Sequence, residues 1–309
     1  MMHIIYYNGF DPSDHGELFQ QLMPDAQIRL WQDGDQQPAD YALVWKPPIQ
    51  MLAGRDDLKA IFNLGAGVDA IMKLSDQIPA HVPIIRLEDA GMAEQMADYV
   101  THAALGYFRH FDQYQRLAGQ RQWQPKWPDK KSEFSVAVLG LGVLGSVIVQ
   151  RLQQLNFPVL GWSRSQKNLA GVDCYFGLDG LKECLSRARV AVGILPLTEA
   201  TTGILNRTNL AYLPKGAYLI NVGRGAHVVE EDLLELLQNG HLAGATLDVF
   251  QTEPLPQQHP FWHQANITIT PHISAQTVLE EGNQQIAGKL RQLEQGLPVT
   301  GVINRQLGY

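Results

Sequence analysis

The sequence predicts an α/β protein with two domains, each built on a doubly wound parallel sheet. Its 309 residues are 45% hydrophobic, enough to bury a large core, and at about 150 residues per domain this length indicates two domains. Short β-branched or aromatic runs alternate along the chain with more polar, helix-compatible stretches. Such alternation is typical of parallel sheets covered by helices on both faces.

The first group of strands forms an N-terminal domain. The segments with the composition of strands are His3–Asn8, Gln27–Trp31, Tyr41–Trp45, Ala60–Leu64 and Ile84–Leu87. A long helical pattern follows from about Ala93 to Ala118. The Trp- and Pro-rich polar stretch from Gln120 to Lys131 is expected on the surface.

A second group of strands predicts the other domain. Its members are Ser135–Leu139, Val159–Trp162, Val190–Leu195, Tyr218–Asn221, Ala245–Val249 and Ile267–Thr270. From about Gln276 the pattern is helical again until Gly296, so we expect the chain to cross back and pack on the first domain.

Composition excludes several classes of function. The formal charge of −7 disfavours a nucleic-acid-binding face, which needs clustered Lys and Arg. The two cysteines, Cys174 and Cys184, lack the spacing of a zinc site, so we expect buried thiols and no metal. No long apolar run and no basic, apolar leader is present, which predicts a cytoplasmic protein without a membrane segment.

A glycine-rich segment, Gly140-Leu-Gly-Val-Leu-Gly145, follows an apolar strand and precedes a helical pattern. Gly140 permits a tight turn, Gly142 permits close approach of a pyrophosphate, and Gly145 permits close packing of helix on strand. The alternative is a tight turn without a ligand. The context favours a dinucleotide site that includes Val143 and Leu144, at the N-terminus of the helix.

The end of the next strand selects the cofactor. An NAD enzyme carries an acidic residue there to bind the ribose hydroxyls, but this chain has Ser163, Arg164, Ser165 and Lys167. These groups suit a 2′-phosphate. NADPH is therefore favoured and NADH use stays open, the alternative being that Arg164 and Lys167 are ordinary solvated charges.

Three polar residues follow predicted strands of the second domain: Arg224, Glu253 and His272. Ligands of doubly wound sheets bind at the carboxyl ends of the strands. Reduction of a keto acid needs a cation for the carboxylate and carbonyl, which Arg224 supplies, and an acid, which His272 supplies. A carboxylate from Glu253 against the other ring nitrogen favours the imidazolium form.

These segments together resemble the D-isomer-specific 2-hydroxyacid dehydrogenase family, in which Arg, Glu and His of matching motifs are catalytic. Further matches are Asn63–Asp69, similar to the family's substrate-binding loop, and Leu195–Gly203, similar to its cofactor-domain loop. Within the family, Val44–Pro48 and the closing Gly-Tyr most resemble the glyoxylate/hydroxypyruvate reductase A branch.

The resemblance implies a Rossmann cofactor domain inserted in a flavodoxin-like substrate domain. The substrate domain would comprise residues 1–100 and 277–309, and the dinucleotide-binding domain residues 101–276. It also implies a homodimer. The activity it implies is NADPH-linked reduction of small 2-keto acids, glyoxylate to glycolate and hydroxypyruvate to glycerate.

The resemblance also implies roles for residues outside the catalytic set. Gly65, Ala66 and Gly67 would offer backbone N–H groups to the substrate carboxylate, with Arg224 reaching over from the other domain. The remaining residues are assigned to substrate binding (Leu64, Trp45, and His272 beside Arg224) and to cofactor binding (Leu195, Pro196, and Asp248 near the nicotinamide).

Other interpretations stay open. The chain could be a broader 2-keto-acid reductase, a dehydrogenase of a larger hydroxy acid, or a catalytically silent NADP(H)-binding regulatory protein. A methyltransferase would leave the Arg, Glu and His set unexplained. His227, His259 and His263 have no role indicated by spacing and are read as core or solvated residues. Trp262 is either a pocket wall or filler, and Lys46 either neutralises a substrate tail or is an ordinary surface charge.

Overall fold

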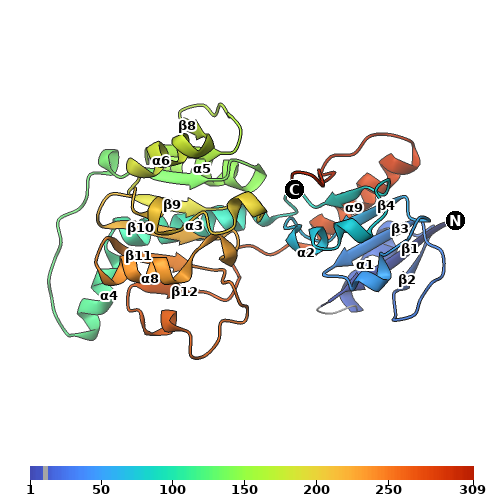
Figure 1. The fold of residues 1–309 in the computed structure, drawn as a ribbon, viewed down its shortest axis with the longest axis horizontal. Helices are drawn as coiled ribbons and strands as arrows, with labels where there is room; N and C mark the ends of the chain where they lie inside the picture. The colour runs from blue at the N-terminus through green and yellow to red at the C-terminus, as the bar shows by residue number, and fades with distance from the viewer. Residues whose placement is uncertain (10–12) are drawn as a thin grey trace. The chain divides into compact units, whose positions relative to one another are not determined.

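The computed structural model of the protein describes residues 1–9 and 13–309. Its contacts divide into two compact units, Met1–Gly91 with Thr277–Tyr309, and Met92–Gln276 (Figure 1). The boundary predicted from the sequence, after residue 100, falls inside the helix that begins at Met92. That helix, α3 (Met92–Phe108), packs against α5 (Val143–Gln154) and so belongs wholly to the second unit.

The first unit is a parallel sheet with strand order β2-β1-β3-β4-β5. This is the flavodoxin-like order, and it confirms the predicted doubly wound sheet. Its strands are β1 (Met2–Asn8), β2 (Ala26–Leu30), β3 (Tyr41–Trp45), β4 (Ala60–Asn63) and β5 (Ile84–Arg86). Its helices are α1 (Ser13–Leu22), α2 (Asp69–Met72) and α9 (Leu279–Glu294), of which α9 packs against α1.

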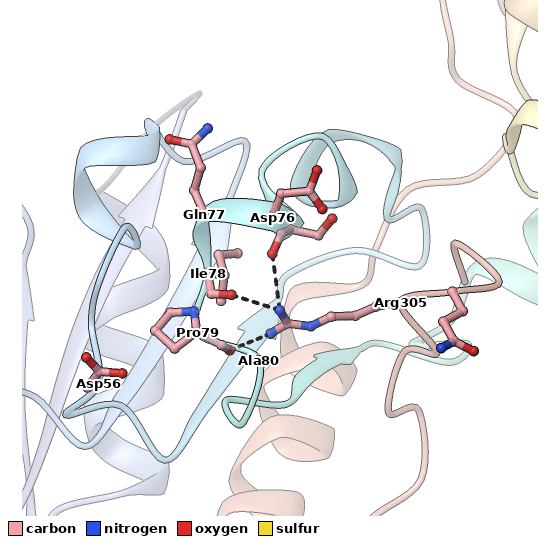
Figure 2. A pocket seen from close by; sticks show the side chains of 9 residues that line it. Asp56, Asp76, Gln77, Ile78, Pro79, Ala80 and Arg305 are labelled. Carbon is pink, nitrogen blue, oxygen red and sulfur yellow. Dashed lines mark hydrogen bonds between the residues drawn. The ribbon is translucent and has the colours of Figure 1, made fainter.

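The residues after α9 are tied into this unit. Val302 forms an antiparallel bridge with Ile85 of β5. Arg305 then donates from both terminal nitrogens to four backbone carbonyls, those of Ser75, Ile78, Pro79 and Val82, at 2.6–3.1 Å. Figure 2 shows the guanidinium inserted into this turn, beside a recess of about 550 Å³ that none of the predicted site residues lines. The C-terminal segment is therefore part of the first unit.

The second unit is a larger parallel sheet with strand order β12-β11-β10-β9-β6-β7-β8. Counted from β6, its first strand, this is the Rossmann order 3-2-1-4-5-6 with one strand added. The strands are β6 (Val136–Leu139), β7 (Val159–Ser163), β8 (Asp173–Phe176), β9 (Val190–Gly193), β10 (Ala217–Asn221), β11 (Leu242–Leu247) and β12 (Ile267–Ile269). The helices besides α3 and α5 are α4 (Phe111–Gly119), α6 (Gly177–Ser186), α7 (Arg207–Leu210) and α8 (Glu230–Gln238).

Both faces of this sheet are covered at its centre, which explains why β6 and β9 are apolar throughout. Along β6, Val136 and Val138 pack into a cluster with Val100 of α3 and Ile148 of α5. The intervening residues point to the opposite face, where Leu139 joins a cluster formed with α6, α7 and α8. A strand buried on both faces reads as a continuous apolar run and not as an alternation.

Three elements differ from their predicted form. The single helix expected over 93–118 is two helices, because His110 adopts a left-handed conformation (φ 58°) directly before α4 begins at Phe111. The edge strand β8 was missed, since its four residues, Asp-Cys-Tyr-Phe, are short and partly exposed. β11 begins at Leu242, three residues earlier than predicted. The prediction missed this start because Gly244 is a residue type uncommon in strands. Glycine is required there, since a Cβ would come within 2.6 Å of the Asn266 carbonyl oxygen.

Among residues 1–9 and 13–309, no helix has both the length and the apolar content needed to cross a membrane. No group of three or more His, Cys, Asp or Glu side chains is arranged there to hold a metal ion.

Candidate active site

The predicted catalytic residues follow three neighbouring strands. Arg224 comes after β10, Glu253 after β11 and His272 after β12, and these strands lie side by side in the sheet. All three strands run in the same direction, so their carboxyl ends meet at one edge. The sheet therefore collects a cation, a carboxylate and an imidazole at the edge where doubly wound folds bind ligands.

Glu253 and His272 form a close pair. The Glu253 Oε2 atom lies 2.8 Å from His272 Nδ1, and its Oε1 accepts a 3.0 Å hydrogen bond from the Phe250 N–H. Burial acts to raise the pKa of Glu253, but the hydrogen bonds from His272 and Phe250 and the charges of His272 and Arg224 outweigh it, so the pKa lies below its ordinary value. The carboxylate is therefore ionised at neutral pH and occupies Nδ1, so that Nε2 is the ring nitrogen not engaged by Glu253.

The loop that presents His272 is held by Asp248. His272 has a left-handed backbone (φ 56°), which is uncommon for a residue with a side chain. The Asp248 carboxylate is fully buried and accepts hydrogen bonds from the Thr270 hydroxyl (2.6 Å) and from the N–H groups of Ile273 and Ser274 (2.8 Å each). Its carbonyl accepts the His272 N–H at 2.9 Å. Asp248, expected near the nicotinamide, thus has both carboxylate oxygens engaged by this loop.

The Arg224 backbone is held in a similar way. Its carbonyl accepts a 3.0 Å hydrogen bond from the buried Asn221 amide, and its N–H donates to His227 Nδ1 at 3.2 Å. Because Nδ1 accepts, the proton lies on Nε2, which donates to the Pro196 carbonyl at 3.3 Å. Of the two possibilities left open by the sequence, core or solvated, His227 takes the first: it is fully buried and links the loops after β9 and β10.

Close packing of two loops also fixes Arg224. A Cβ on the next residue, Gly225, would lie 1.8 Å from the carbonyl carbon of Phe250. Only glycine permits this approach. The loop that carries Arg224 therefore lies directly against the loop that carries Glu253, and the Arg224 charge contributes to the lowered pKa of that carboxyl.

The glycine-rich turn has the shape that a pyrophosphate requires. Gly140 has φ 118°, and a Cβ on Gly145 would lie 1.9 Å from the Gly140 carbonyl oxygen. A Cβ on Gly142, by contrast, would meet open space. Gly142 is also the N-cap of α5 and, as glycine, offers the helix no side-chain cap. The exposed first turn, with Val143 and Leu144, therefore presents N–H groups and positive dipole to an anion.

Around this turn lie the other predicted cofactor residues. Ser163 ends β7, beside β6 in the sheet, and its hydroxyl donates to the Ser165 carbonyl at 2.8 Å. Arg164 and Ser165 follow it on the exposed surface. Leu195 and Pro196 follow β9, on the other side of β6, with Leu195 buried and Pro196 exposed. The residues present thus fit a dinucleotide with an extra phosphate.

In the first unit, Trp45 and the loop Leu64–Gly67 lie together. Trp45 ends β3 and the loop follows the adjacent β4. A Cβ on Gly65 would come within 2.4 Å of the Trp45 ring, so the indole packs directly against the loop backbone. The buried Asn63 amide donates to the carbonyls of Gly65 and Gly67 at 2.8 and 2.9 Å, which curls the loop.

Other residues left open by the sequence have separate places. Trp262 is half exposed and its indole N–H donates to the Pro256 carbonyl at 2.9 Å. His259 pairs with Glu230 at 3.2 Å and is largely buried, whereas His263 is exposed. Lys46 is exposed and lies 6.0 Å from the centre of the Trp45 ring.

Comparison with known proteins assigns the family. The family model for the D-isomer specific 2-hydroxyacid dehydrogenase NAD binding domain matches residues 101–274. The chain belongs to this family. The match covers more than half of the chain and includes the glycine-rich turn and all three catalytic candidates.

Relatives of this family match over the full length. The chain is 48% identical to the glyoxylate/hydroxypyruvate reductase A of Serratia proteamaculans and 46% identical to that of Salmonella heidelberg, with 100% of each protein covered. A family member from Xanthobacter autotrophicus Py2, in complex with NADPH and MES, superposes with a TM-score of 0.94 at 38% identity, covering 100% of this chain and 99% of that one. The NADPH-dependent glyoxylate/hydroxypyruvate reductase of Sinorhizobium meliloti, with NADP and sulfate, gives 0.93 at 33% identity and full coverage of both chains.

The sequence did not single out the residues that hold the catalytic groups in place. His227 and Asn63 stand inside recognised motifs, yet nothing in their spacing indicates hydrogen bonds to the neighbouring loops. Buried polar residues are generally hydrogen-bonded. A buried Asn or His within a functional motif is therefore the signal that could have identified them, but burial itself is known only from the fold.

The Glu253 carboxylate gives the first prediction. The pKa of Glu253 lies below the ordinary glutamate pKa of 4.5. Its side chain is therefore negatively charged at any pH above 4.5, and the charge is lost only as the pH falls below that value. Glu253→Gln removes the charge at every pH. We expect kcat of the dehydrogenase reaction in the reducing direction to fall by less than the ~10²–10⁴-fold contributed by a general acid, and the alkaline limb of its pH profile to move to lower pH. Steady-state rates between pH 5 and 10 measure both.

The matched control is Asp129→Asn, which removes a carboxylate from another pair, with His110 at 3.6 Å. Its pH profile should coincide with that of the unmodified protein. A Glu253→Gln profile that also coincides would contradict the role given to this carboxylate.

Proposed function

We propose that the protein is an NADPH-dependent reductase of glyoxylate and hydroxypyruvate, giving glycolate and glycerate. The observation that carries the proposal is the ionised Glu253 paired with His272 at 2.8 Å, at the sheet edge shared with Arg224. NADPH supplies the hydride when bound. A protein that only binds a nucleotide has no chemical need for an imidazole held against a carboxylate, which disfavours the regulatory alternative.

Each residue of the set has a role in this reaction. Arg224 binds the substrate carboxylate and polarises the adjacent carbonyl through its planar fork. His272 Nε2 donates a proton to the carbonyl oxygen as negative charge develops on it, and Glu253 stabilises the imidazolium that precedes this transfer. In the first unit, proposed as the substrate-binding domain, the curled backbone of Gly65–Gly67 lies beside the Trp45 ring and offers N–H groups for binding substrate.

The cofactor is bound by the second unit, proposed as the dinucleotide-binding domain. The turn Gly140–Gly145 and the first turn of α5 hold the pyrophosphate, and Leu195 and Pro196 lie across β6 from Ser163. Arg164 and Ser165, exposed at the end of β7, bind the 2′-phosphate. The 2′-phosphate is supported by the lack of an acidic residue at the end of β7, and the pyrophosphate by the open space at Gly142. The protein relatives named above support the same cofactor and substrates, while the broader 2-keto-acid reductase remains the second candidate.

The experiment that tests the function follows absorbance of the reduced nicotinamide with glyoxylate, hydroxypyruvate and pyruvate, each with NADPH and NADH. We expect rapid NADPH oxidation with the first two acids. His272→Ala should lower kcat by about 10²–10⁴-fold, the contribution of a general acid, while NADPH still binds.

His263→Ala is the matched control. His263 is an exposed histidine nine residues before His272 in the sequence, and it has no assigned role. It should leave kcat unchanged. Binding of NADPH without turnover of any of the acids by the unmodified protein would favour the regulatory alternative. Faster turnover of pyruvate than of glyoxylate and hydroxypyruvate would favour the broader reductase.

A second variant tests the phosphate site. Arg164→Ala should weaken NADPH binding by about 10- to 100-fold, the equivalent of the ~1.5–3 kcal/mol of a hydrogen bond to a charged group. NADH binding should change little. Titration of protein fluorescence with each cofactor measures both affinities, with Arg207→Ala, an exposed arginine on α7, as control. Equal losses for the two cofactors would contradict the assignment.

We also propose a homodimer. Trp123 and Trp127 are 97% and 92% exposed, in the segment that runs as a long coil from α4 toward β6 (Figure 1). Tryptophan side chains carry large apolar surfaces, and clusters of such surface mark interaction sites. Sedimentation velocity should give the mass of two chains, and the mass of one chain would contradict the proposal.

The cytoplasm is the compartment that we propose for this enzyme. Its cysteines, Cys174 and Cys184, are both free thiols, the state that a reducing compartment maintains. Burial raises the pKa of Cys184 to about 12, so this thiol is also unreactive. Recovery in a periplasmic or membrane fraction after cell fractionation would contradict this placement.

A further inference from the structure

A tyrosine of helix α3 contacts the loop that carries His272. The Tyr99 hydroxyl lies 2.5 Å from the Thr270 hydroxyl, and Thr270 stands two residues before His272. The two residues are 171 positions apart in the chain. Neither belongs to the cofactor or substrate motifs, and both lie within the second unit.

The direction of the hydrogen bonds follows from the number of protons available. Thr270 Oγ1 lies 2.6 Å from Asp248 Oδ1, and an ionised carboxylate only accepts. The single hydroxyl proton of Thr270 is therefore given to Asp248. It follows that Tyr99 donates its own proton to Thr270, and the chain of donors runs from Tyr99 through Thr270 to Asp248.

This chain ends on the group that shapes the catalytic loop. Asp248 holds the N–H groups of Ile273 and Ser274 with its carboxylate and the His272 N–H with its carbonyl. His272 itself stands in a left-handed conformation that the surrounding contacts must stabilise. The hydrogen bond from Thr270 therefore holds the Asp248 carboxylate in place. The carboxylate in turn holds the backbone that determines the direction of the His272 imidazole.

We propose that Tyr99 is a positioning residue for His272 and acts through Thr270 and Asp248. The inference rests on the proposed reductase function. Tyr99 touches neither His272 nor Glu253 by any hydrogen bond found among the described residues, so its effect is on where the imidazole lies and not on its chemistry. Burial raises the pKa of Tyr99 to about 12, and the phenol therefore remains a donor across the working pH range.

The test compares Tyr99→Phe with Tyr107→Phe. Tyr107 lies two turns further along α3 and is a buried phenol whose hydroxyl donates to the backbone carbonyl of Gly216. Both variants lose one hydrogen-bonded hydroxyl from the same helix. A displacement of about 1 Å in a reacting group can cost on the order of 10²-fold in rate; since Asp248 keeps its backbone contacts, we expect Tyr99→Phe to lower kcat about tenfold, with KM for glyoxylate and Kd for NADPH unchanged. Tyr107→Phe should leave kcat unchanged.

Thr270 supplies the second arm. Thr270→Val, which removes the hydroxyl, should lower kcat at least as much as Tyr99→Phe, and Thr270→Ser, which keeps it, should restore most of the rate. The Tyr99→Phe/Thr270→Val double variant should be no slower than Thr270→Val alone, because both changes interrupt one chain.

Melting temperatures of all variants separate positioning from loss of stability. Equal losses of kcat in Tyr99→Phe and Tyr107→Phe, additive losses in the double variant, or an unchanged kcat in Tyr99→Phe would each overturn the proposal. If the unmodified protein binds NADPH but reduces none of the keto acids, the proposed function is overturned instead. The two failures are distinguishable, because this one is seen in the rate of the unmodified protein and the others only in the variants.

Discussion

The buried carboxylate of Asp248 is the interaction on which the catalytic edge of the second unit depends. A fully buried charge is costly unless hydrogen bonds replace its lost hydration. Here a hydroxyl and two backbone N–H groups do so, and all three come from the loop after β12. The loop can satisfy them only by folding tightly around Asp248, which places His272 in its left-handed conformation. The need to solvate one charge thereby sets the direction of the imidazole.

Parallel pairing brings the remaining groups to the same place. Arg224, Glu253 and His272 are far apart in the chain, but β10, β11 and β12 are neighbours and share one direction. The close approach of Gly225 to Phe250 then presses the first two loops together. Because these constraints act on backbone, the side chains are held by loops whose own positions are fixed, as precise catalysis requires.

Most of this arrangement could be predicted from the sequence because it depends on local signals. Apolar runs mark the strands, glycine spacing marks the turn after β6, and strand order follows from the doubly wound pattern. The groups that hold the site could not be predicted. Tyr99 and Thr270 form a hydrogen bond although they are 171 positions apart in the chain. His227 forms hydrogen bonds with the backbone of two loops. The break between α3 and α4 falls at His110, which is neither glycine nor proline. These features arise from tertiary packing, which overrides local preference.

Arg224 provides a local positive charge in a protein whose net charge is negative. The protein carries a formal charge of −7, which repels an anionic keto acid at long range. Binding must therefore come from nearby groups, of which Arg224 supplies a planar guanidinium that suits a carboxylate. The same charge helps to keep Glu253 ionised, since it lowers the pKa of that carboxyl. In the reaction that we propose, this arginine would serve two tasks: it attracts the substrate, and its charge lowers the pKa of the carboxyl that pairs with His272.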